Sequence, residues 1–272
     1  MASAPGNVYF KRYLKIAPFS LALWRSVEAQ VLAKYPLKRP VLDIGCGFGE
    51  FGGVFFSSQV EVGVDIDHKD ILRAAATGKY KETIVADARK LPFKDNTFGT
   101  IISISTLEHI PDNSKVFREA FRVLKPGGFF YYTVPTTKLY DGLLIVKILN
   151  FLGLKGLSHI YYRAYNKAFK HVFIPSTKVW LNLAEKAGFK IEKVQGTFSQ
   201  SALILFELCL PLAIPSQLSR IFLGRRLKFG TSLKKEISNP LAHFVRADPS
   251  FMANIFVAAQ KLPKSRKAKN AR

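Results

Sequence analysis

The stretch VLDIGCGFGEFG, residues 41–52, decides the fold. A short apolar run is followed by three glycines at alternate positions, and Asp43 lies just before them. A glycine loop between a strand and a helix lets backbone N–H groups and the positive helix end approach a ligand that a Cβ would exclude. Glu50 stands where a dinucleotide fingerprint has its third glycine, and its carboxylate would repel a pyrophosphate. The loop therefore favours a ligand with a cationic amino group and no phosphate.

Strand-like runs recur along the chain and leave room for helices between them. This alternation is typical of parallel β-α-β units and predicts an α/β fold. The seven runs lie at residues 41–44, 60–64, 83–86, 100–104, 129–134, 189–194 and 254–261.

Helices are predicted before and between these runs. Residues 9–35 have helical periodicity, and Pro18 must break them into two pieces because proline cannot continue a helix. Ser176 is placed to cap a helix that runs to about Lys186, and Gly188 is placed to end it.

Two acidic residues follow the loop at the ends of later strands. Asp65 comes twenty residues after Gly45, where a carboxylate can accept hydrogen bonds from ribose hydroxyls. Asp87 ends the third strand at the same edge of the sheet. Since ligands of open α/β sheets bind at the carboxyl ends of the strands, we expect these acids and the loop to converge on one nucleoside pocket.

The motifs VLDIGCGFG, GVDID, VADARKLPF, TLEHIPD and FREAFRVLKPGG together resemble those of class I S-adenosylmethionine-dependent methyltransferases, especially the small-molecule and lipid-acting branch. The resemblance covers residues 41–135 and extends weakly to 186–194 and 254–261. It implies a Rossmann-like, mostly parallel seven-stranded sheet whose last strand is antiparallel, with an N-terminal helical segment and helical insertions.

The resemblance also implies which residues bind the cofactor, S-adenosyl-L-methionine. Asp43 and Gly45 would hold its methionine part, Asp65 the ribose hydroxyls, and Asp87 with Ala88 the adenine edge. Ile104 and Ser105 would flank the sulfonium. The complete expected set is Asp43, Gly45, Cys46, Gly47, Gly49, Asp65, Ile66, Asp87, Ala88, Ile104 and Ser105.

Methyl transfer from a sulfonium depends mainly on holding donor and acceptor in line, so a general base is needed only if the acceptor must lose a proton. His109 is the candidate catalytic residue, because it follows the fourth strand and titrates near neutrality when unperturbed. The alternative is a histidine that packs the cofactor lid. Some quinone O-methyltransferases bind a metal through a glutamate where this chain has Ser105, so we expect no metal.

A polar and aromatic cluster follows the fifth strand, where this family builds its acceptor pocket. Both an acceptor pocket and a surface belt are compatible with it. The members are His159, Tyr161, Tyr162, Tyr165 and His171.

Composition excludes a disordered chain and an integral membrane bundle, because 48 % of residues are hydrophobic and 22 % are charged. Two cysteines and no secretory apolar core near the first residue indicate a cytoplasmic protein. The net charge of +22 is uneven: residues 1–135 carry 18 Lys/Arg and 13 Asp/Glu, whereas 136–272 carry 23 and 6. The second half therefore faces something anionic.

Two apolar segments accompany these basic residues. Residues 142–156 predict a helix with a narrow polar strip, compatible with either a buried cap or lipid contact, and residues 202–235 mix apolar and basic residues. The apolar run of the second segment, residues 202–215, has only fourteen residues and contains Glu207 and Pro211, so neither segment should cross a bilayer. The segment 202–235 favours attachment to an anionic membrane surface.

We therefore expect methyl transfer to a lipid, an isoprenoid or quinone, or a lipid-linked acceptor at the inner, cytosolic membrane face. The alternatives are an RNA methyltransferase that uses the basic half, and an inactive membrane-docking protein on the same scaffold. The expected divisions are an N-terminal helical segment (1–40), the cofactor-binding core (41–136), an acceptor-side cap (137–175), a helix and sixth strand (176–195), a basic and apolar insertion (196–252), the last strand (253–262) and a disordered basic tail (263–272).

Overall fold

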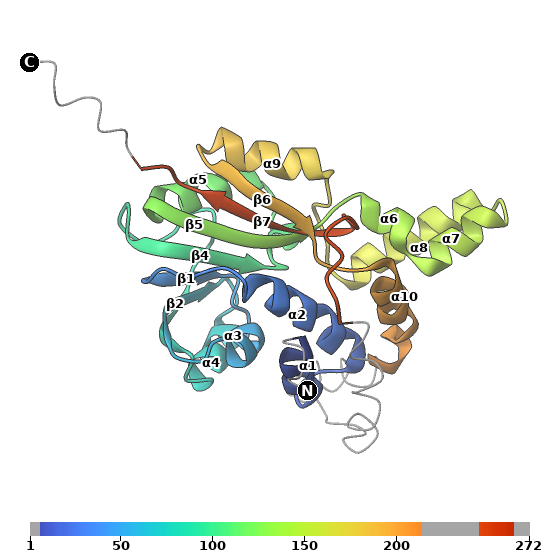
Figure 1. Cartoon of the computed structure of the whole chain (residues 1–272), viewed down its shortest axis with the longest axis horizontal. Coiled ribbons are helices and arrows are strands. Elements are labelled where there is room, and N and C mark those ends of the chain that lie inside the picture. The colour runs from blue at the N-terminus through green and yellow to red at the C-terminus, as the bar shows by residue number, and fades with distance from the viewer. Residues whose placement is uncertain (1–5, 214–244, 264–272) are drawn as a thin grey trace, which may run out of the picture. The chain divides into compact units, whose positions relative to one another are not determined.

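The computed structural model describes residues 6–213 and 245–263, in which seven strands form one sheet (Figure 1). Their order across the sheet is β3-β2-β1-β4-β5-β7-β6. The strands are β1 (Val41–Ile44), β2 (Val60–Asp65), β3 (Tyr80–Val85), β4 (Phe98–Ile104), β5 (Leu124–Pro135), β6 (Lys190–Gly196) and β7 (Asn254–Gln260). All seven predicted strands are confirmed, and the bounds differ most at the start of β5.

Strand β7 runs antiparallel to the others. β1 pairs in parallel with β2 and β4, and β2 pairs in parallel with β3. Between β5 and β7 the residue numbers run in opposite directions. The Gly127 N–H donates to the Lys261 carbonyl, whereas the Thr136 N–H donates to the Ala253 carbonyl. The Rossmann-like sheet with an antiparallel last strand is thereby confirmed.

The central strands lack the polar alternation of a half-exposed sheet because both of their faces are covered. Every residue of β1 and of β4 is buried, and strands covered on both faces read as continuous apolar runs. β3, at the edge of the sheet, instead exposes Lys81 and Glu82.

The helices of the described part are α1 (Gly6–Leu14), α2 (Phe19–Leu32), α3 (Glu50–Phe55), α4 (His68–Ala76), the 3₁₀ helix η1 (Leu107–His109), α5 (Asn113–Val123), α6 (Lys138–Gly142), α7 (Leu144–Phe151), α8 (Lys155–Ala168), α9 (Thr177–Lys186) and α10 (Gln200–Leu208). The predicted break at Pro18 separates α1 from α2. α9 begins directly after Ser176, and Gly188 follows it with φ +105°. The break at Pro18 and the predicted bounds of α9 are confirmed.

The chain divides into two compact units. The first unit comprises the described residues of 1–35, 133–177 and 195–256, and the second unit those of 36–132, 178–194 and 257–272. The first unit holds α1, α2, α6, α7, α8 and α10; the second holds α3, α4, α5 and α9.

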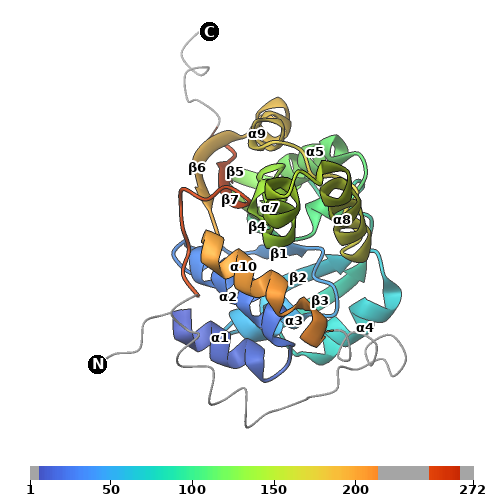
Figure 2. The same ribbon diagram turned by 90° about the vertical axis from the view of Figure 1, so that its right-hand side faces the viewer.

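The apolar segment 142–156 is not a single helix. α7 ends at Phe151, and α8 begins at Lys155. Gly153 lies between them with φ +74°, a left-handed conformation that glycine adopts without strain. The two helices contact each other and lie side by side in Figure 2.

A buried carboxylate caps α7 from elsewhere in the first unit. Glu207 of α10 accepts hydrogen bonds from the N–H groups of Leu144 (2.5 Å) and Ile145 (3.2 Å) and from the Tyr161 hydroxyl (2.7 Å). Residue Leu143, at the N-cap of α7, offers no side-chain cap. Glu207 therefore joins α7, α8 and α10, and its charge lies where a helix N-terminus favours an anion.

α10 is the described beginning of the segment 202–235. It buries Ala202, Leu203 and Phe206, and the Phe206 ring lies 4.9 Å from that of Trp24 on α2. Leu208 and Leu212 are exposed. The rest of the predicted membrane-contact segment lies outside the described residues, as does the basic tail from residue 264.

A second buried carboxylate ties α2 to two strands of the first unit. Glu28 is fully buried and accepts hydrogen bonds from Arg25 Nη1 at 3.0 Å, Thr133 Oγ1 at 2.7 Å and Asn254 Nδ2 at 3.3 Å. These partners lie on α2, β5 and β7 respectively. A buried charge is tolerated only when it is paired and hydrogen-bonded, and Glu28 is both.

Replacing Glu28 with alanine should therefore lower the free energy of unfolding by about 3 kcal/mol, because it leaves three polar groups without their hydrogen-bond acceptor around a cavity. Urea unfolding followed by circular dichroism measures the change. Glu185→Ala, at an exposed position of α9, is the control and should change stability by less than about 0.5 kcal/mol. Equal stabilities of the two variants would contradict the assignment.

Candidate functional site

The glycine loop turns the chain from β1 into α3 through three left-handed residues. Gly45, Gly47 and Gly49 have φ values of +74°, +51° and +76°. A Cβ on Gly45 would lie 2.0 Å from Cγ2 of Thr106, whereas a Cβ on Gly47 would meet nothing within 4 Å. Gly45 is therefore required by packing inside the protein, while Gly47 faces open space that a ligand can enter.

Asp65, at the end of β2, holds this loop in place. Its Oδ2 accepts a hydrogen bond from the Gly47 N–H at 2.8 Å, and its Oδ1 accepts one from the Asp67 N–H at 3.0 Å. The next residue, Ile66, is 68 % exposed. A carboxylate oxygen can accept more than one hydrogen bond, so Asp65 retains capacity for a ribose hydroxyl beside an apolar surface. This combination fits a nucleoside.

Asp43 lies beneath the loop and is buried. Its Oδ2 accepts a hydrogen bond from the Tyr80 hydroxyl at 2.7 Å. Cys46 is buried beside it, and burial, together with the charges of Asp43 and Asp65, raises the pKa of the Cys46 thiol far above its usual value. The thiol therefore stays protonated and does not act as a nucleophile.

Asp87 is already engaged in an ion pair. Both of its oxygens contact the Arg89 guanidinium at 2.7–3.0 Å, and this hydrogen bonding holds the pKa of the Asp87 carboxyl below its ordinary value. The Ala86 N–H donates to the Asp65 carbonyl, so Asp87 and the buried Ala88 follow directly after a contact with Asp65. An adenine amino group would share this carboxylate with Arg89, because each carboxylate oxygen can accept more than one hydrogen bond.

The end of β4 closes the loop from another side. Ile104 is buried, and Ser105 has φ +46°, an uncommon conformation for a residue with a side chain. The Thr106 hydroxyl then donates to the Gly45 carbonyl at 3.2 Å. The sequence-predicted residues at the ends of β1, β2, β3 and β4 are thus brought to one edge of the sheet within the second unit.

His109, the candidate base, ends η1. The His109 N–H donates to the Thr106 carbonyl at 3.0 Å, and its Nε2 lies 4.0 Å from Oε1 of the buried Glu108. The His109 side chain is partly exposed. It is therefore accessible to a reactant.

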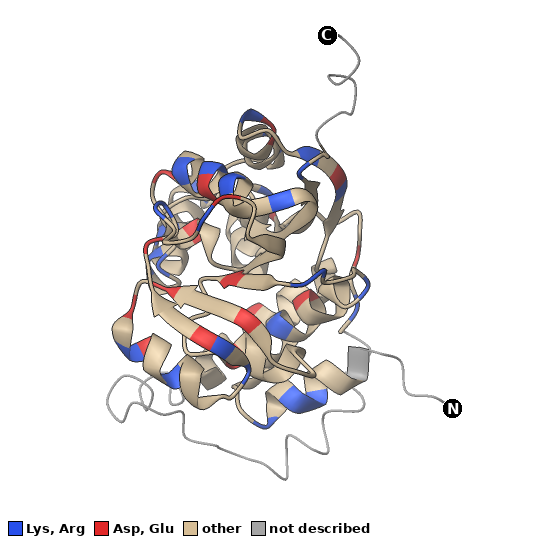
Figure 3. Cartoon of the chain, turned by 90° about the vertical axis from the view of Figure 1, so that its left-hand side faces the viewer, with Lys and Arg blue, Asp and Glu red and all other residues tan. Residues whose placement is uncertain are grey.

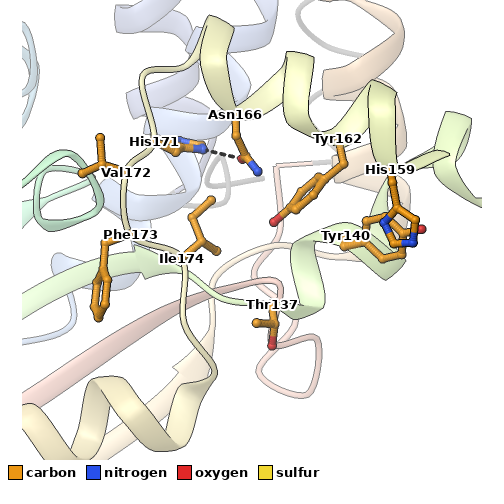
Figure 4. Close-up of a pocket in the computed structure, with 9 residues that line it drawn as sticks. All are labelled: Thr137, Tyr140, His159, Tyr162, Asn166, His171, Val172, Phe173 and Ile174. Carbon is orange, nitrogen blue, oxygen red and sulfur yellow. Dashed lines mark hydrogen bonds between the residues drawn. The ribbon is translucent and has the colours of Figure 1, made fainter. Parts of the chain in front are cut away.

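A separate pocket of about 460 Å³ lies in the first unit (Figure 4). Of the predicted cluster, His159, Tyr162 and His171 line it, whereas Tyr165 is buried and Tyr161 hydrogen-bonds to Glu207. Its complete lining is Thr137, Tyr140, His159, Tyr162, Asn166, His171, Val172, Phe173 and Ile174.

Side-chain contacts order the polar part of this pocket. The His171 Nδ1 lies 3.1 Å from Asn166 Oδ1, which can only accept, so a hydrogen bond here places the proton on Nδ1 (Figure 4). Burial raises the pKa of Tyr162, although a hydrogen bond with Asn166 acts in the opposite direction. The Tyr140 ring stacks on that of His159 at 5.3 Å. The pocket thus combines aromatic rings with oriented polar groups.

Three side chains near the glycine loop were not predicted from the sequence. Tyr80, Arg89 and Thr106 contact Asp43, Asp87 and Gly45 respectively. Nothing in the motif spacing points to Tyr80 or Thr106, because each meets its partner only through the pairing of strands. Arg89 follows Asp87 by two residues, a separation from which its side chain can reach back.

The described residues hold neither a cluster of metal ligands nor a membrane-spanning helix. Residues 6–213 and 245–263 contain no group of three or more His, Cys, Asp or Glu that could hold a metal ion. In the same residues, no helix is both long and apolar enough to span a membrane.

Residues 42–132 match a family model described as a methyltransferase domain. The chain carries a class I S-adenosylmethionine-dependent methyltransferase domain. This confirms the family that the motifs indicated, and the cofactor expected from the sequence agrees with it.

Curated relatives match part of the chain. A tRNA (carboxymethyluridine(34)-5-O)-methyltransferase of Arabidopsis thaliana is 36 % identical over 146 residues, which cover 50 % of this chain and 34 % of that protein. A sterol 4-C-methyltransferase of Caenorhabditis elegans is 33 % identical over 128 residues, covering 43 % and 38 %. The matched segment thus spans little more than a third of either relative.

The fold extends beyond the methyltransferase domain. A solved structure from Thermotoga maritima, described as a possible histamine N-methyltransferase, superposes with a TM-score of 0.57 at 17 % identity. The superposition covers 93 % of this chain and 94 % of that one. At this identity the likeness concerns the fold alone.

Replacing two glycines of the methyltransferase domain with alanine should change the stability of the protein in opposite directions. Gly45→Ala should lower the free energy of unfolding by about 2 kcal/mol or more, because the new methyl group meets Thr106 and the left-handed conformation is strained. Gly53→Ala should raise it by about 0.5 kcal/mol, because Gly53 is an exposed helical residue with open space around it. Urea unfolding of both variants tests the pair, and changes of the same sign would contradict the loop geometry.

Proposed function

We propose that this protein is an S-adenosylmethionine-dependent methyltransferase whose acceptor is a lipid of sterol or isoprenoid type, and that it works at the cytosolic face of a membrane. The observation that carries the proposal is the open glycine loop tied to Asp65 within a methyltransferase domain. The membrane part is a separate component of the proposal, with its own test.

The residues of the loop suit each part of the cofactor. The open side of Gly47 admits the amino-acid end, Asp65 accepts hydrogen bonds from the ribose, and Ile66 offers an apolar surface to the adenine. Asp43, Gly45, Cys46 and Gly49 form the walls of the loop, and Asp87 with Ala88 and Ile104 with Ser105 complete the proposed site. When bound, the sulfonium supplies a methyl group on an activated carbon.

The reaction does not require a covalent intermediate with the protein. A bond forms between the acceptor atom and the methyl carbon while the carbon–sulfur bond breaks, and the acceptor then loses a proton. Holding the acceptor in line supplies much of the catalysis. His109 is the proposed group for taking the proton, since neutral histidine is a suitable base near pH 7.

The pocket of the first unit supports a lipid acceptor. Val172, Phe173 and Ile174 provide apolar lining, and Tyr140 and Tyr162 provide aromatic rings. Such walls fit the hydrocarbon body of an isoprenoid or sterol, and His171 with Asn166 can hold a polar end group. The sterol-acting relative supports the same class of acceptor.

RNA is the second candidate acceptor, because a tRNA-acting relative is 36 % identical over half of this chain. The basic second half, with 23 Lys/Arg against 6 Asp/Glu, is compatible with phosphate contacts. The apolar lining of the pocket favours the lipid.

Cofactor binding can be tested at Asp65. Asp65→Asn keeps one oxygen for the Gly47 N–H but removes the charge, so affinity for S-adenosylmethionine should fall about 100-fold, the loss of one or two charge-assisted hydrogen bonds. Isothermal titration calorimetry measures it. Glu82→Gln removes an equal charge at an exposed position of β3 and should bind within twofold of the wild type. Equal affinity of all three proteins would refute the placement of the ribose.

Turnover tests the acceptor class. With methyl-labelled S-adenosylmethionine, the protein should label a total lipid extract and leave total tRNA unlabelled. Tyr162→Ala should lower lipid labelling by about tenfold without changing cofactor affinity, because it removes one wall of the pocket. Val179→Ala, an exposed position of α9, is the control. Label in tRNA would establish the second candidate, and no label in either extract would favour an inactive scaffold.

A further inference from the structure

The turn between α7 and α8 exposes large apolar side chains in the first unit. Phe151 is 90 % exposed and Leu152 59 %, and Leu154 and Leu157 are exposed beside them. We call these four residues the apolar tip. Soluble proteins rarely leave such residues contiguous on a surface unless something binds there.

The exposed apolar surface continues along both helices. Along α7, Ile145 and Ile148 lie three positions apart, and Leu152, the C-cap residue, follows four positions later, so the three share one side of the helix. On α8, Leu157 and Ile160 are also three apart. The opposite side of α7 is occupied by the buried Val146. Each helix therefore has an inner face that packs and an outer apolar stripe that leads to the tip.

The charged residues of the segment that carries this surface all have one sign. Residues 142–177 contain no Asp or Glu. Five basic residues lie in the same range, and all are exposed: Lys147, Lys155, Arg163, Lys167 and Lys170. The second unit differs, because Lys or Arg is interspersed with Asp or Glu over β2, β3 and α4 (Figure 3). A surface of apolar side chains and basic residues is complementary to an anionic membrane, in which negatively charged headgroups lie above an apolar layer.

The dimensions fit shallow insertion. α7 has eight residues and is about 12 Å long, far less than the roughly 30 Å of a bilayer core. A short apolar helix end flanked by Lys and Arg can enter the headgroup and acyl boundary without crossing the membrane. Anionic headgroups at the cytosolic leaflet attract such clusters of basic residues.

We propose that the apolar tip inserts into the interface of an anionic phospholipid membrane while the basic residues of 142–177 contact its headgroups. This inference deepens the membrane part of the proposed function by naming the surface that docks. It assigns the contact to a segment for which the sequence left a buried helix equally open. Vesicle binding needs neither cofactor nor acceptor, so its failure would leave the proposed methyl transfer standing.

The test is co-sedimentation of the full chain with phosphatidylcholine vesicles that contain about 30 % phosphatidylglycerol. The double variant Phe151→Asp/Leu152→Asp should bind about 30-fold more weakly than the wild type, because insertion of both side chains is lost. Leu72→Asp on α4 is the matched control, since Leu72 and Leu152 are each 59 % exposed. It should bind within twofold of the wild type. Equal binding by the wild type and the double variant would overturn the proposal.

A second measurement separates insertion from mere attraction. Tryptophan at position 151 (Phe151→Trp) should shift its emission to shorter wavelength on these vesicles, because the ring leaves water, and should not shift on pure phosphatidylcholine. Emission that stays at the water-exposed wavelength under saturating lipid would overturn the proposal. So would sedimentation equilibrium that shows a dimer of the wild type but not of the double variant without lipid, because the tip would then join two copies of the chain.

Discussion

The hydrogen bond from the Gly47 N–H to the Asp65 carboxylate is the constraint on which the proposed cofactor site depends. It joins the loop after β1 to the end of β2, and the same carboxylate also accepts the N–H of Asp67 at the start of the next connection. Without this hydrogen bond, a glycine-rich loop could adopt many conformations. Because Asp65 already fixes one of them, a ligand entering beside Gly47 meets a preorganised site and spends less of its binding energy on ordering it.

Buried carboxylates organise the first unit in a comparable way. Glu28 holds α2 against two strands, and Glu207 joins three helices. Acids are scarce in residues 136–272, where only six occur, and Glu207 is one that is buried. Taking this charge inside removes one of the few negative charges that could offset the basic surface. Glu207 thus both joins three helices and leaves the surface of this half more basic.

The sheet and its glycine loop were predictable because their signals are local. The apolar runs of β1 and β4 reflect burial on both faces, and the alternate glycines mark a turn that a Cβ would strain. The break within 142–156 was missed, since its apolar pattern continues across Gly153 and only the backbone conformation there ends α7. The partners Tyr80 and Thr106 were also missed. Tyr80 meets Asp43, and Thr106 meets Gly45, only when the strands assemble into the sheet, which spacing along the chain does not encode.

The cap that Glu207 places on α7 has a consequence for biosynthesis. The amide of Leu144 and the carboxylate that accepts it are separated by 63 residues. A helix of eight residues is marginal by itself in water, and its uncapped first turn weakens it further. As the chain emerges from the ribosome, α7 lacks this partner until α10 has been synthesised. The helix pair that bears the apolar tip is therefore completed late. Until then its exposed apolar side chains favour aggregation, which chaperones counteract.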